Sequence, residues 1–255
     1  MQLPKREIEV SYDYRQVVMN FTKIAEEYLS RKFQIAENER GIIFGILAWF
    51  LQDDLIAKEM NIDLNKGLFL TGPIGCGKTT LLKLMQKFPS QRRSFRMFST
   101  RQIVSEFMQS GYETIEKYSR GNLYNETRQP QAICFDDLGA ESASKYFGND
   151  CNVMAEILLS RYDLFISKKL QTHITTNLSA TEIEKHYGNR VRSRLREMVN
   201  LIAFEKIILQ YVHLIQEGYD NIENFRIIAQ SFIKNHEYSK KIIEQDILEL
   251  LNLLY

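Results

Sequence analysis

Residues 72–79, Gly-Pro-Ile-Gly-Cys-Gly-Lys-Thr, have the spacing G-x-x-x-x-G-K-[ST]. They stand between an apolar stretch at 68–70 and a second apolar stretch at 81–85 that has helical spacing. Glycines at these positions let the backbone curl, so that successive N–H groups converge on one phosphate and the following helix directs its positive end there. The segment therefore predicts a loop that binds the phosphates of a nucleotide.

Two side chains of this loop have predicted roles. Lys78 supplies a mobile positive charge for the β and γ phosphates, and Thr79 offers a hydroxyl oxygen to Mg²⁺, which prefers oxygen ligands. Cys76 occupies a variable position and is interpreted as filler, not as a redox switch. The predicted nucleotide-binding residues are Gly72, Pro73, Ile74, Gly75, Cys76, Gly77, Lys78, Thr79 and Thr80.

A pair of carboxylates follows another apolar stretch, at 132–137. A buried strand would deliver Asp136 to its carboxyl end beside the loop, where ligands bind in open α/β sheets. We expect Asp136 to bind Mg²⁺ directly or through water, and Asp137 to orient the attacking water toward the γ-phosphate. The alternative is a pair of solvated carboxylates at a strand end, which the neighbouring loop makes less favoured.

Polar residues also end the stretch 171–178, which carries Thr175, Thr176 and Asn177. An amide at Asn177 would lie beside the first two sites and could hold the attacking water or a γ-phosphate oxygen. Ser179-x-x-Glu182 then predicts a capping box for the next helix.

An arginine cluster follows Tyr187-Gly188, where we expect that helix to end. Arg190 and Arg194 are four residues apart, which places them on one face if the segment is helical. The cluster is interpreted either as a solvated basic face or as a source of an arginine for a neighbouring subunit's γ-phosphate. Its members are Arg190, Arg192, Arg194 and Arg196.

The composition excludes several classes of protein. The chain of 255 residues is 44% hydrophobic and 25% charged, as expected for a globular domain, and its net charge of +1 gives no global attraction to nucleic acid. The longest apolar run, 41–51, is too short for a bilayer span of ~20 residues, and no signal peptide is indicated. We therefore expect a cytoplasmic protein without a membrane partner. The three cysteines and four histidines show no disulfide framework and no metal-ligand spacing.

Short apolar runs alternate with helical stretches in the middle of the chain, which predicts a parallel sheet with helices on both faces. Two helices are predicted before it, at 14–35 and about 38–52. The segment 206–255 is predicted to be all helical, with a capping box at Asp220-x-x-Glu223. The predicted parts are an N-terminal helical segment at 1–64, a core at 65–205 and a C-terminal helical segment at 206–255. The predicted strands are 67–72, 95–99, 132–136, 173–177 and 201–205.

Four segments together resemble the helicase-loader and transposition-helper ATPases of the DnaC/IstB group, within the AAA+ class of P-loop NTPases. They are GPIGCGKTT, FDDLGAE, ITTNL and YGNRVRSRL, in the family's order over about residues 65–204. The resemblance implies an α/β AAA+ fold and a Mg²⁺-dependent ATPase. Such an ATPase assembles with its own copies and acts on single-stranded DNA or on a partner helicase or transposase.

The resemblance also implies roles for single residues. Lys78 and Thr79 become contacts for ATP and Mg²⁺, Asp136 and Asp137 the acidic pair, and Asn177 the polar sensor. Arg194 takes the place of the arginine finger, with Arg190 as the second candidate. The family's closing Gly-x-Ser-x-Arg is missing after the last strand, and Arg226 is a weak substitute.

Two other classes share the loop. A small-molecule or nucleotide kinase would also have the sheet, but the arginine cluster is followed by a strand instead of an evident lid. A guanine-nucleotide switch would need N-K-x-D, which the chain lacks. If DNA is bound, a local patch must bind it, at Arg92-Arg93 or at the arginines of 190–196.

Overall fold

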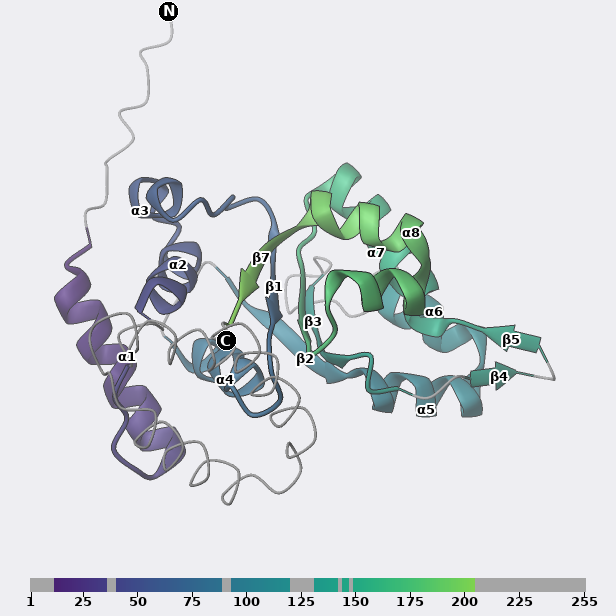
Figure 1. Ribbon diagram of the computed structural model, residues 1–255, viewed down its shortest axis with the longest axis horizontal. Coiled ribbons are helices and arrows are strands. Elements are labelled where there is room, and N and C mark those ends of the chain that lie inside the picture. Colours follow the sequence, from purple (N-terminus) through teal and green to yellow (C-terminus); the bar gives the residue numbers. More distant parts are fainter. Residues whose placement is uncertain are drawn as a thin grey trace, which may run out of the picture. The chain divides into compact units, whose positions relative to one another are not determined.

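The structure is a computed structural model of the chain (Figure 1), and it describes residues 12–35, 40–88, 93–119, 131–141, 144–146 and 149–204. The chain divides into two units, 1–204 and 205–255, and every described residue belongs to the first. The predicted C-terminal helices with their Asp220–Glu223 box, as well as Arg92 and Arg226, lie outside the described residues. The three-part division of the chain stays a prediction.

A five-stranded parallel sheet, in the order β2-β3-β6-β1-β7, forms the centre of the described part. This order places β3, β6 and β1 side by side, so the segments that follow these three strands meet at one edge of the sheet. The strands of the sheet are β1 (Gly67–Thr71), β2 (Phe95–Ser99), β3 (Ala132–Leu138), β6 (Thr172–Thr176) and β7 (Val199–Ala203).

Helices cover both faces of this sheet (Figure 1), with α1, α2 and α4 on one face and α5, α6, α7 and α8 on the other. Side chains of successive strand residues enter opposite clusters: Leu68 and Leu70 pack with the first group of helices, and Phe69 packs with the second. The helices are α1 (Tyr14–Leu29), α2 (Arg40–Leu51), α3 (Asp54–Glu59), α4 (Lys78–Lys87), α5 (Thr100–Ser110), α6 (Tyr112–Ser119), α7 (Val153–Lys168) and α8 (Ala180–Met198).

The N-terminal helices share their hydrophobic core with the sheet. Trp49 of α2 is 1% exposed, and its indole Nε1 donates a hydrogen bond to the carbonyl of Lys66 at 2.8 Å, just before β1. The Trp49 ring also meets the ring of His173 on β6 edge to face, with centroids 4.9 Å apart. His173 Nδ1 in turn accepts a hydrogen bond from the Leu68 amide. These contacts fix α2 against the two strands that carry the loop and the polar strand end.

The helix α8 begins with the predicted capping box, formed by Ser179 and Glu182. At Gly188 the backbone leaves helical geometry, with φ 87° and ψ 159°, and the helix then continues to Met198 with the arginine cluster on it. The break at 187–188 that the sequence predicts is therefore confirmed, and the arginines lie on the second half of a kinked helix.

The predicted α/β class with a parallel sheet is confirmed, and the element boundaries differ in places. The first helix ends at Leu29, well before residue 35, because Ser30 takes a left-handed conformation with φ 52°. The last strand begins at Val199 instead of residue 201. Asn200, a polar residue, is accommodated there because its amide bonds the backbone of Asp63 and Gly67. A small antiparallel ribbon of β4 (Ser144–Tyr146) and β5 (Asn149–Cys151) was not predicted.

Candidate active site

The glycine-rich segment connects β1 to α4, as its spacing predicts. Gly77 precedes the helix with φ 90°, and Gly72 follows the strand with φ 147°. A Cβ atom on Gly72 would lie 2.7 Å from the Cβ of Phe204, so a larger residue does not fit there without displacing the end of β7. Both positions therefore need glycine, and the loop directs the N-terminus of α4 toward the edge of the sheet.

Lys78 is the first residue of α4, and its side chain bends back over the loop. It is 7% exposed, and its ammonium group donates to the carbonyls of Gly72 and Pro73 at 2.8 and 2.7 Å. A third bond, 2.8 Å long, reaches Oδ1 of Asn177 at the end of β6. The structure thus brings together the loop lysine and the polar strand end, which are 99 residues apart in the sequence.

Thr79 and Asp136 form a second contact between the loop and the sheet. The Thr79 hydroxyl donates to Oδ1 of Asp136 at 2.7 Å, and both residues are partly exposed. Among the described residues, no three acidic, histidine or cysteine side chains gather into a metal site. An oxygen pair of one hydroxyl and one carboxylate nevertheless fits Mg²⁺, which takes its other ligands from water and substrate phosphates.

Asp137 occupies an irregular end of β3. Its φ of 62° is left-handed, and the pairing of β3 with β6 shifts between Phe135 and Leu138. Its carboxylate accepts a hydrogen bond of 3.3 Å from the Asn177 amide group, whose oxygen is bonded to Lys78. Lys78, Asn177 and Asp137 therefore form one chain of polar contacts at the carboxyl edge of the sheet.

Three buried hydroxyl groups that the sequence did not assign a role hold this irregular segment. Thr175 donates to Asp136 Oδ1 at 2.7 Å and accepts from the Asp137 amide at 2.9 Å. Thr100, at the start of α5, donates to the Asp137 carbonyl at 2.9 Å, and Thr176 donates to the Leu138 carbonyl at 2.6 Å. A threonine pair at a strand end is the only signal in the sequence, and it does not reveal which backbone groups are bonded.

The geometry is that of a nucleotide site: a phosphate loop at a helix N-terminus, an oxygen pair for Mg²⁺, and a carboxylate beside an amide. Residues 67–149, which include the loop and the acidic strand end, match a family model described as AAA domain (dynein-related subfamily). The chain carries a P-loop ATPase core that is similar to an AAA domain. This finding confirms the class predicted from the sequence. No curated protein matches the chain.

Three solved structures are among those similar to this ATPase core. One is described as a candidate primosome component from Streptococcus pyogenes serotype M3, with 20% identity over 67% of this chain and 81% of that chain, at a TM-score of 0.48. Another is the DnaC helicase loader, with 21% identity over 55% of this chain and 79% of that chain, at 0.40. A third is AMPPCP-bound DnaA from Aquifex aeolicus, with 17% identity over 84% of this chain and 68% of that chain, at a TM-score of 0.43.

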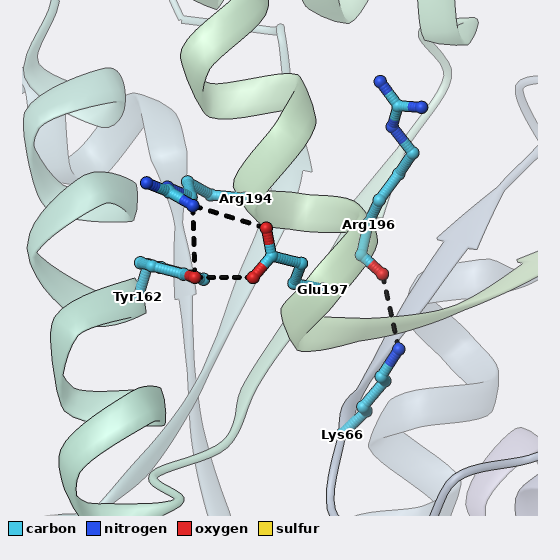
Figure 2. A network of polar contacts seen from close by, with 5 residues as sticks. All are labelled: Lys66, Tyr162, Arg194, Arg196 and Glu197. Carbon is cyan, nitrogen blue, oxygen red and sulfur yellow. Dashed lines mark hydrogen bonds and ion pairs between the residues drawn. The ribbon is translucent and has the colours of Figure 1, made fainter.

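The arginine cluster of the ATPase core lies on α8, after the break at Gly188. Figure 2 shows Arg194 facing Tyr162 of α7, with Glu197 completing a triangle of hydrogen bonds. The guanidinium lies 4.4 Å from the centre of the Tyr162 ring. Arg192 pairs with Glu184.

Arg190 and Arg196 are exposed on the same helix, α8. Arg196 points away from the triangle in Figure 2, and its backbone carbonyl accepts a bond from Lys66.

Two further observations concern the rest of the ATPase core. A cavity of about 960 Å³ lies among residues of α3, β1, α8 and β7, and its lining includes Thr71 and Leu178 but none of the loop residues 72–79. Within the described residues, no helix is long and apolar enough to cross a bilayer.

Proposed function

We propose that this ATPase core hydrolyses Mg²⁺–ATP, assembles with copies of itself, and uses the ATP cycle to act on DNA or on a DNA-processing partner, as helicase loaders and transposition helpers do. The observation that carries the hydrolytic part is the polar chain from Lys78 through Asn177 to Asp137, beside the Thr79–Asp136 pair. These groups would meet the γ-phosphate, the attacking water and the metal ion.

In this proposal each group has one task. Lys78 leaves its loop carbonyls to contact the β and γ phosphates, while the backbone amides of the loop hold the phosphates in place. Thr79 and Asp136 would hold Mg²⁺, and the bound ion would neutralise charge that develops on the phosphate oxygens. Asp137 orients a water molecule and accepts its proton, and Asn177 fixes the Asp137 carboxylate through its amide group.

Water as the acceptor is favoured over a kinase substrate by the position of Asp137. Its carboxylate accepts the Asn177 amide group at the sheet edge. Its backbone amide and carbonyl are bonded to the hydroxyls of Thr175 and Thr100, and this support suits the positioning of a small nucleophile. A direct test measures inorganic phosphate release from ATP with and without Mg²⁺, alongside a screen of nucleotide and small-molecule phosphate acceptors. Release of phosphate to water alone supports the proposal, and transfer to an acceptor in place of hydrolysis contradicts it.

Self-assembly is supported by the position of Arg194. The parallel register pairs Gly67 of β1 with Val199 of β7, so Arg194 comes shortly before the amino end of these strands. The loop leaves β1 at its carboxyl end, and five residues of strand span ~16 Å. From this position we infer that Arg194 contacts the γ-phosphate of a neighbouring copy of the chain and not its own. Arg190, the second candidate, lies one turn earlier on the same half of α8.

The macromolecular partner is inferred from the segments FDDLGAE and ITTNL, which resemble the DnaC/IstB group. For DNA, the exposed Arg190 and Arg196 are the candidate contacts. Arg93 is held elsewhere, because its guanidinium stacks 3.9 Å from the Trp49 ring.

The test of DNA binding titrates a labelled single strand in the presence of ATP over a range of salt concentration. Binding should weaken steeply as salt rises, because counterions are released on binding. No binding at low salt would favour a protein partner, such as a helicase or transposase, which copurification with the Asp137→Asn variant would identify.

A further inference from the structure

Glu141 joins the acidic segment to a helix of the other layer. One oxygen of its carboxylate, Oε2, accepts the Gly139 amide at 2.9 Å. The other, Oε1, accepts a short hydrogen bond from the hydroxyl of Tyr187 on α8. A single side chain thus bridges the turn after Asp137 and a residue 46 positions further along the chain.

The turn that Glu141 holds is conformationally demanding. Asp137 and Gly139 both have positive φ, 62° and 100°, and the Ala140 amide closes the turn on the Asp137 carbonyl at 3.0 Å. A Cβ atom on Gly139 would lie 2.5 Å from Leu178 Cδ1, so the turn is packed tightly against the segment after β6. A non-glycine residue in a left-handed conformation persists only where surrounding contacts hold it.

Tyr187 lies just before the break in α8. It is 8% exposed and belongs to the hydrophobic cluster of this face, while Gly188 carries the non-helical geometry. Burial, and then the Glu141 charge and hydrogen bond, raise the pKa of Tyr187 above its ordinary value. The hydroxyl therefore stays protonated and remains a donor throughout the neutral range.

We propose that Glu141 and Tyr187 are positioning residues, which hold the Asp137 turn in the orientation needed to direct the attacking water. Neither side chain belongs to the polar chain of Lys78, Asn177 and Asp137, and each acts through the Gly139 backbone. The proposal rests on the hydrolytic role of Asp137 given above. Because Glu141 links the turn to Tyr187, the first half of α8 and the turn after Asp137 would move together.

The test compares three variants in single-turnover hydrolysis of saturating Mg²⁺–ATP, with ATP affinity measured separately. Tyr187→Phe removes one bond to a partly buried carboxylate and keeps the ring, so turnover should fall about tenfold with ATP affinity unchanged. Glu141→Gln keeps one acceptor oxygen, and its turnover should fall by a similar factor. Glu141→Ala removes both bonds, and its turnover should fall further, by about 30-fold or more.

A matched control exists in the same hydrophobic cluster. Tyr118 is 3% exposed, and its hydroxyl bonds the carboxylate of Glu106 at 2.9 Å, between α6 and α5. Tyr118→Phe removes the same kind of bond at a place away from the acidic turn, and it should change turnover less than about twofold. A Tyr187→Phe effect no larger than the Tyr118→Phe effect would overturn the proposal.

A double-mutant cycle separates positioning from a general structural role. If the two residues act as one device, adding Tyr187→Phe to Glu141→Ala has no further effect on turnover. Independent, multiplying losses, or a loss of ATP affinity with unchanged maximal turnover, would contradict the proposal. If Glu141→Ala fails to fold, the cycle uses Glu141→Gln. Asp137→Asn is measured in parallel: if it keeps full turnover, the hydrolytic assignment has failed, whereas a loss in Asp137→Asn without one in Tyr187→Phe rejects this inference alone.

Discussion

The replacement of Thr175 by valine tests the hydroxyl contacts that hold the acidic segment. Thr175 is 1% exposed, and its hydroxyl both donates to the Asp136 carboxylate and accepts the Asp137 amide. Valine has nearly the same shape, so the change removes two hydrogen bonds without opening a cavity. One of the lost bonds is to a charged group, and a backbone amide is left without its partner, so the free energy of unfolding should fall by about 2–4 kcal/mol.

A second buried threonine provides the control. Thr114 is also 1% exposed, but its hydroxyl has no hydrogen-bond partner among the described residues. Thr114→Val should therefore leave the free energy of unfolding unchanged or raise it, because a buried polar group is removed at no loss of bonding.

Urea unfolding measures both variants, with fluorescence of Trp49, the only tryptophan and a buried one, as the probe. Thr175→Val should also slow ATP hydrolysis, since Asp136 and Asp137 lose a shared support. Equal unfolding midpoints for the two valine variants would refute the reasoning.

Three further predictions address the loop, the arginine and the core. Lys78→Ala should lose most ATP affinity in an equilibrium binding assay while remaining folded, whereas Lys83→Ala, on the exposed side of the same helix, should bind as the wild type does. Arg194→Ala should bind ATP normally but hydrolyse it poorly, and mixing it with Lys78→Ala should restore part of the activity. An inactive mixture of co-assembled variants would exclude action across subunits. Burial, and then nearby Arg93 and Arg161, lower the pKa of His173 to about 3. In the unfolded chain this imidazole takes up a proton near pH 6.5. As the pH falls below 6.5, the free energy of unfolding should therefore decrease by up to about 1.4 kcal/mol per pH unit. Urea unfolding at several pH values measures this slope, which His173→Gln should remove.

Most of the sheet was predictable because each strand is a short apolar run with a polar or glycine-rich end. The strand at 95–99 agrees at both ends with the structure. The loop was predictable because its residue types are dictated by local backbone geometry, as at Gly77. Local requirements of this kind leave a signal within a few residues of sequence.

The supporting contacts were not predictable, because they depend on strand order and on helix packing. Thr100 resembles any polar residue at a helix start, and only the pairing of β2 with β3 brings it to the Asp137 carbonyl. Glu141 and Tyr187 are far apart in the chain, and nothing in their neighbours indicates a shared hydrogen bond. The strand boundary at Asn200 was displaced for the same reason, since its polar side chain bonds the backbone of Asp63, before β1, and of Gly67, the first residue of β1.

The central claim is that Asp137 directs water to the γ-phosphate while Thr79 and Asp136 hold the metal ion. It is tested most directly by Asp137→Asn, which keeps the side-chain shape and removes only the charge and the basic oxygen. The account predicts Mg²⁺–ATP affinity within about threefold of wild type, together with single-turnover hydrolysis that is at least ~100-fold slower. Hydrolysis within about threefold of the wild-type rate, with ATP binding intact, would contradict it.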